Sequence, residues 1–133
     1  MNLFARLAWS IGLIFVLGCA PRETVIIRGT VKLDSNPLPE GNIKFFYGEQ
    51  LPAGVGKVRD GKYELECKPR GLLRVEITAV KELGAADPSD ERNGTRIQYL
   101  PERYNMKSQL TAEVTPDSQN EFHFSLLSQP ATK

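Results

Sequence analysis

The sequence predicts an all-β fold, namely a seven-stranded antiparallel sandwich. Short segments of alternating apolar and polar residues recur along the chain. Turn-forming residues separate them at roughly even spacing, and no helical period lasts longer than one turn. Strands with one buried face alternate in this way, and seven of them in one domain are typical of two packed sheets. The predicted strands are residues 24–33, 42–47, 54–59, 62–67, 72–80, 110–115 and 121–127.

The alternation also predicts which side chains form the core. In the first segment every second residue is apolar or glycine, and residues 34–37 then form a turn. In the second segment the same phase leaves Phe46 on the solvent face. The residues predicted to point inward are Val25, Ile27, Gly29, Val31, Leu33, Ile43, Phe45, Tyr47, Tyr63, Leu65, Cys67, Leu73, Val75, Ile77, Ala79, Leu110, Ala112, Val114, Phe122, Phe124 and Leu126.

One hairpin is signalled more strongly than any other local structure. An Asp-Gly pair at residues 60–61 separates two alternating segments, which is the strongest short-range indication of a two-residue β-turn. We expect this turn to place Val58 opposite Tyr63 and Gly56 opposite Leu65.

The second half of the chain contains a long polar segment and an aromatic one. Residues 81–98 are rich in Gly, Asp, Asn and Ser, and we expect a loop without secondary structure there, of the functional or mobile kind. The next seven residues place two tyrosines and a leucine around Pro101. This composition is typical of residues that close the end of a sandwich, and a surface for carbohydrate or peptide is the alternative. The candidate binding residues are Tyr99, Leu100, Arg103 and Tyr104.

The N-terminus has the layout of a bacterial secretory signal. Arg6 precedes an apolar run that ends in Val16-Leu17-Gly18-Cys19. This run is too short to span a membrane as a helix. A plain signal would leave Cys19 as an ordinary thiol. With Gly18 directly before it, the cysteine instead predicts cleavage at this point and acylation of its sulfur, so the chain resembles a bacterial lipoprotein precursor.

Composition and these signals define the predicted domain organisation. Residues 1–18 form the lipoprotein signal peptide, 19–23 a lipidated tether, 24–127 the β-sandwich domain and 128–133 a C-terminal tail. The whole chain has 17 Lys and Arg against 16 Asp and Glu, a balance that gives no electrostatic reason to expect nucleic acid. We expect an envelope protein, anchored by lipid on Cys19 and facing the periplasm or the exterior. Ala20 after the cysteine favours the outer membrane over the inner one.

The mature chain also resembles a known family. Its turn and strand motifs follow one another in a characteristic order: Gly29-x-Val31, Asn36-Pro37-Leu38, Asp60-Gly61-x-Tyr63-x-Leu65 and Leu100-Pro101-x-x-Tyr104-Asn105. In this order they resemble the motifs of small bacterial lipoproteins with a carboxypeptidase regulatory-like or transthyretin-like domain. The resemblance implies a prealbumin-like Greek-key sandwich and assigns no activity. We therefore expect a structural or protein-interaction role, with an envelope protein or glycan as partner. Recognition of carbohydrate or peptide by residues 81–105 is the alternative.

The sequence offers no catalytic grouping, cofactor motif or metal site. His123 is the single histidine and falls on a predicted solvent face, so a Ser-His-acid triad is disfavoured. One histidine and one free thiol cannot supply the usual zinc ligands. Asp87, Asp90 and Glu91 lack the regular spacing of a calcium loop. Cys67 is expected to be a small buried side chain rather than a redox thiol. We expect a protein without enzymatic activity.

Overall fold

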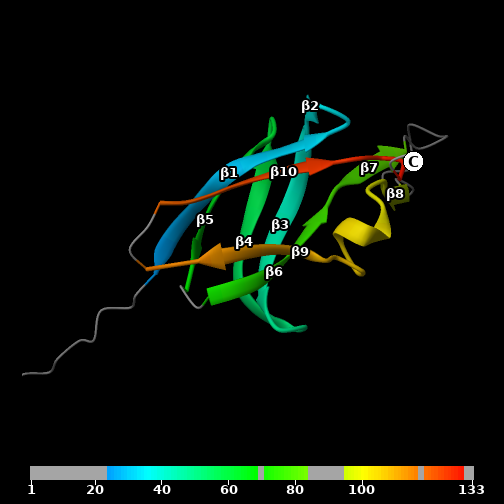
Figure 1. Cartoon of the computed structure of the whole chain (residues 1–133). Helices are drawn as coiled ribbons and strands as arrows, with labels where there is room; N and C mark the ends of the chain where they lie inside the picture. The colour runs from blue at the N-terminus through cyan, green and yellow to red at the C-terminus, as the bar shows by residue number, and fades with distance from the viewer. Residues whose placement is uncertain (1–23, 69–70, 84–94, 117–118, 131–133) are drawn as a thin grey trace, which may run out of the picture.

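The protein is all-β in the computed structural model, which describes residues 24–68, 71–83, 95–116 and 119–130 (Figure 1). Within these ranges no helix is long and apolar enough to cross a membrane. A single 3₁₀ turn, η1 (Glu102–Tyr104), is present there. The described strands are β1 (Val25–Leu33), β2 (Asn36–Pro37), β3 (Glu40–Tyr47), β4 (Leu51–Arg59), β5 (Lys62–Cys67), β6 (Gly71–Thr78), β7 (Val80–Leu83), β8 (Thr95–Gln98), β9 (Leu110–Val114) and β10 (Asn120–Leu126).

Seven strands form one curled sheet in the order β10-β1-β5-β4-β3-β6-β9, and β2 adds to β1. All seven correspond to predicted strands. The neighbours pair antiparallel except β1 and β10, which are parallel, so the expectation of a purely antiparallel arrangement was wrong for this pair. The cause is the connection before β10. The chain enters β10 at Asn120, opposite Ile27 near the start of β1, and the two strands then run in the same direction.

The sheet curls at the β4–β5 hairpin. Asp60 and Gly61 have φ of +49° and +74°, as expected for an Asp-Gly turn. Arg59 and Lys62 are the register pair of this hairpin, and the expected pairs Val58–Tyr63 and Gly56–Leu65 are not part of the ladder. Leu65 instead packs directly on β4. A Cβ on Gly54 or Gly56 would lie within 3.0 Å of the Leu65 side chain, so the two glycines permit this close approach.

The predicted alternation is confirmed, since every residue predicted to point inward belongs to one core except Gly29, which borders a surface hollow. Leu38 and Leu100 join this core from outside the regular strands, and both are fully or almost fully buried. Phe46, expected in solvent, is half-buried because the guanidinium of Arg74 lies 4.9 Å from the centre of its ring.

Two predictions for the connecting segments need correction. The expected structureless segment 81–98 contains most of β7 and all of β8, which pair as a separate two-stranded sheet. Every side chain of this ribbon is exposed. Because neither strand has a buried face, the sequence shows no alternation of apolar and polar residues that would predict the ribbon. The predicted turn at residues 34–37 is two residues long, at Asp34 and Ser35, and the following Asn36–Pro37 pairs with β1.

Candidate functional site

The predicted lipidation and cleavage residues, Gly18 and Cys19, lie outside the described residues, as do Asp87, Asp90 and Glu91. The acylation of Cys19 therefore stays a prediction. Among the side chains that the structure does describe, no group of three His, Cys, Asp or Glu residues is placed to hold a metal ion.

The predicted binding residues lie together at the end of the sheet that carries the β7–β8 hairpin. Leu100 is buried in the core, with 4% of its surface exposed. Tyr99 is half-buried, and its main-chain N–H donates to the Ala79 oxygen at 3.1 Å. The Lys81 ammonium lies 5.9 Å from the centre of the Tyr99 ring. Burial raises the pKa of the Tyr99 phenol above its ordinary value.

Arg103 and Tyr104 hold the main chain that follows β10. The Arg103 guanidinium donates to the carbonyl oxygens of Leu127 and Gln129, and it lies 4.8 Å from the centre of the Tyr104 ring. The Tyr104 hydroxyl accepts a hydrogen bond of 2.9 Å from the Leu127 N–H. These contacts close one end of the sheet. A binding role for the four residues stays a prediction, and Tyr99 is the member that also borders a hollow on the surface.

That hollow, which we call the Tyr99 depression, has a volume of about 710 Å³. It separates the β7–β8 ribbon from the outer faces of β3 and β4. The ribbon contributes an ion pair in which Arg96 Nε lies 3.2 Å from Glu82 Oε1. The lining residues are Pro39, Glu40, Gly41, Asn42, Lys57, Val80, Lys81, Glu82, Arg96 and Tyr99.

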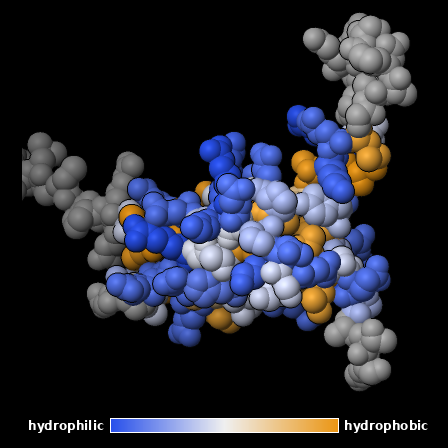
Figure 2. All heavy atoms as spheres, turned by 90° about the horizontal axis from the view of Figure 1, so that it is seen from above, coloured by the Kyte–Doolittle hydropathy of each residue, from blue (hydrophilic) through white to orange (hydrophobic). Residues whose placement is uncertain are grey.

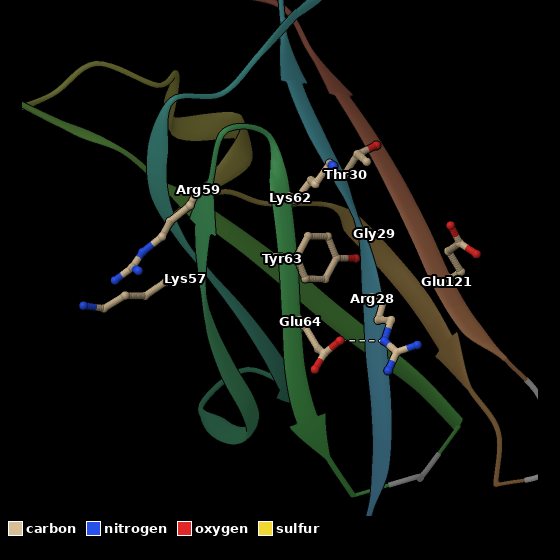
Figure 3. A pocket seen from close by; sticks show the side chains of 9 residues that line it. All are labelled: Arg28, Gly29, Thr30, Lys57, Arg59, Lys62, Tyr63, Glu64 and Glu121. Carbon is tan, nitrogen blue, oxygen red and sulfur yellow. Dashed lines mark hydrogen bonds and ion pairs between the residues drawn. The ribbon is translucent and has the colours of Figure 1, made fainter.

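A second hollow lies on the outer side of β1, β4, β5 and β10, and we call it the β4–β5 groove (Figure 3). Its volume is about 620 Å³, and it is open to solvent. Figure 3 shows Arg28 and Glu64 meeting between β1 and β5, while Lys57 and Arg59 extend from β4. The lining residues are Arg28, Gly29, Thr30, Lys57, Arg59, Lys62, Tyr63, Glu64 and Glu121.

Positive charge dominates this groove. Four cations and two carboxylates give its lining a formal charge of +2, compared with +1 for the entire chain. Arg28 Nε pairs with Glu64 Oε2 at 2.6 Å. The side chains of Lys57, Arg59 and Lys62 form no ion pair or hydrogen bond with any other described residue. Three exposed cations are therefore available to an external anion.

His123 lies beside the groove on β10. Its Nδ1 is 2.8 Å from Thr30 Oγ1, and its Nε2 is 3.2 Å from Glu121 Oε1. The order hydroxyl, imidazole, carboxylate resembles a hydrolytic triad. However, the three side chains form an exposed row on two strands, whereas triads act beside fixed oxyanion donors in a site that excludes water. We interpret the row as cross-strand contacts of the kind that stabilise sheets.

Compared with protein-family models, with curated proteins and with solved structures, the chain has no match.

The β4–β5 groove is not predicted by the composition, because the even charge balance of the whole chain conceals a local excess of positive charge. A signal was nevertheless present. Lys57, Arg59 and Lys62 fall within six residues around the predicted turn, and all three occupy outward positions of the alternation.

Exposed apolar side chains offer a weaker site. Figure 2 shows one face on which hydrophobic residues occur in separate groups among hydrophilic ones, rather than as one continuous patch. Isolated exposed apolar residues are normal on soluble surfaces.

Proposed function

We propose that this chain is a bacterial lipoprotein whose Cys19 carries the lipid anchor and whose β-domain acts by non-catalytic contact with another component of the cell envelope. The observation that carries the proposal is the motif Val16-Leu17-Gly18-Cys19 after a short apolar run. The Greek-key, prealbumin-like sandwich belongs to the same proposal. It is supported by the curl at β4–β5, where Leu65 packs on two glycines and the inward faces of the strands enclose one core.

The position of Cys19 relative to β1 would orient the domain. Val25 begins β1 six residues after Cys19, and a fully extended chain of that length spans at most about 20 Å. The start of β1 would thus lie close to the membrane. The Asp60–Gly61 turn would point away from it, because Thr30 and Lys62 pair five residues farther along β1.

Metabolic labelling with an alkyne-tagged fatty acid tests the anchor. We expect label on the wild-type chain and on Cys67→Ala, which removes the other cysteine, and none on Cys19→Ala. Unlabelled wild-type protein, or label retained by Cys19→Ala, would contradict the proposal.

The membrane that holds the protein can be tested separately. Ala20 follows the acylated cysteine, and we propose the outer membrane as its location. Fractionation of the envelope should find the wild-type chain in the outer membrane and Ala20→Asp in the inner one. An unchanged distribution of the variant would refute this sorting role for position 20.

Recognition of carbohydrate or peptide by residues 81–105 is a second candidate function. The Tyr99 depression favours it, because a half-buried tyrosine, a lysine and an ion pair border one hollow. A glycan and peptide array with the full-length chain tests this candidate. Tyr99→Ala should abolish any binding found. Met106→Ala, a change at a side chain that is 84% exposed and lies outside the hollow, should leave it unchanged. Equal binding by both variants would count against this candidate.

A further inference from the structure

We infer that the β4–β5 groove is a binding site for a polyanionic chain, specifically an acidic polysaccharide that carries carboxylates. Three cationic side chains support this assignment, namely Lys57, Arg59 and Lys62. They line one open hollow, and they lack ionic partners among the described residues. Unneutralised cations in one concavity raise the local concentration of anions.

The charge of the groove is arranged in a row rather than at one point. Lys57 and Arg59 are two residues apart on the same face of β4, which separates their backbones by about 7 Å. Lys62 stands opposite Arg59 on the neighbouring strand. A single small anion could contact only part of this row, whereas a chain with repeated negative groups could contact all of it.

A second hollow extends the row. Lys57 lines both the β4–β5 groove and the Tyr99 depression. The depression adds Lys81, while its Arg96 is paired with Glu82 and its lining also includes the Glu40 carboxylate. The two hollows therefore meet at one lysine and form a surface longer than either. This continuity favours an elongated ligand.

Two features favour a polysaccharide over nucleic acid and anionic lipid. Tyr63 is the only aromatic residue of the β4–β5 groove lining and is 4% exposed, and Tyr99 of the adjoining depression is half-buried. The three unpaired cations therefore have no exposed ring beside them on which a nucleic-acid base could stack. Anionic lipid headgroups are disfavoured because the groove would lie away from the membrane surface. This step rests on the proposed anchor at Cys19. Lys62 pairs with Thr30, about 17 Å along β1 from the end that would face the membrane.

Binding of polygalacturonate, a polymer of a sugar acid, tests the inference. The full-length chain in an uncharged detergent should bind it at low salt, and should bind its fully methyl-esterified, neutral form far more weakly. Lys57→Gln with Lys62→Gln should weaken binding about tenfold and make its salt dependence shallower, because two charge contacts are lost. The matched control, Lys68→Gln with Lys107→Gln, removes the same charge from exposed positions outside the groove and should bind as the wild type does.

Several outcomes would overturn the inference. These are no binding of polygalacturonate, equal weakening by both double variants, or tighter binding to single-stranded DNA or to phosphatidylglycerol vesicles than to polygalacturonate. The binding assay does not depend on acylation. Failure of the fatty-acid labelling would therefore refute the anchor and remove the positional argument against lipid headgroups, a choice that the vesicle comparison then decides. Failure of the binding assay would refute the groove alone.

Discussion

The Tyr63 hydroxyl donates a hydrogen bond of 2.9 Å to the main-chain oxygen of Phe122, across the strand that separates them. Gly29 of β1 is the register partner of Tyr63 on β5 and of Phe122 on β10. Because Gly29 has no side chain, the tyrosine can reach over β1. One side chain thereby ties together three strands, including the parallel pair that the sequence did not indicate.

Replacement of Tyr63 by phenylalanine should lower the free energy of unfolding by about 1 kcal/mol, since the ring stays and one largely buried hydrogen bond is lost. Urea denaturation near neutral pH measures this. Burial also raises the pKa of the Tyr63 phenol well above its ordinary 10.0. The folded state therefore favours the neutral phenol, and wild-type stability should fall as pH rises above about 10. Tyr63→Phe should show a flatter alkaline limb. Identical curves for the two proteins would contradict the role assigned to the hydroxyl.

Gly29→Ala should be more damaging than Tyr63→Phe. A Cβ at position 29 would lie 1.7 Å from the Phe122 oxygen and 2.8 Å from the Tyr63 hydroxyl, so the main chain must move. We expect a loss of about 3 kcal/mol in the free energy of unfolding, measured by urea denaturation. The double variant Gly29→Ala with Tyr63→Phe removes only the second clash and should recover little stability. Full recovery in the double variant would show that the clash with the Tyr63 hydroxyl, rather than the clash with the β10 backbone, causes the loss of stability.

The core could be predicted from the sequence because each main strand has one buried face. Tyr63, Leu65 and Cys67 alternate with Lys62, Glu64 and Glu66, and the structure buries the first set and exposes the second. A period of two therefore identifies both the strand and its orientation. The Asp60–Gly61 turn was predictable for a different reason, because few residue pairs adopt positive φ at two successive positions.

What the sequence could not indicate depends on contacts between distant segments. The exposed ribbon of β7 and β8 has no buried face, and Leu100 reaches the core from outside the strands. Residues 99–105 are recognisable in the sequence by their unusual composition. The attachment of Arg103 and Tyr104 to the main chain beyond β10, however, is a tertiary contact that no local pattern encodes. The cationic groove likewise forms only when β1, β4, β5 and β10 lie side by side.

The Cys67 thiol should be unreactive in the native protein. It is 1% exposed, its Sγ donates to the Lys68 oxygen at 3.4 Å, and burial raises its pKa above the ordinary value. In Cys19→Ala, where Cys67 is the only thiol, alkylation by iodoacetamide should be slower in buffer than in urea by about two orders of magnitude or more. Comparable rates in the two conditions would show that the end of β5 opens readily.

Asp34 should make the attachment of the segment after β10 sensitive to acid. Its carboxylate accepts a hydrogen bond of 2.9 Å from the Ser128 N–H. Hydrogen bonds from the side chain and the main-chain N–H of Ser128 hold the pKa of the Asp34 carboxyl below its ordinary 3.8. For a lowered pKa the stabilisation is complete above about pH 4 and is lost as pH falls through the native pKa. Hydrogen exchange and the NMR shift of the Ser128 amide should therefore report its release at low pH.

Asp34→Asn is the matched variant for this prediction, because Asp34 has φ of +50° and asparagine tolerates that conformation. The variant keeps an acceptor oxygen but has no charge to titrate. The Ser128 amide should then exchange faster at neutral pH than in the wild type, and its exchange should show no additional acid-induced step. The same acid step in both proteins would assign it to another carboxyl group, such as Glu102, whose ion pair with Lys107 also lowers its pKa.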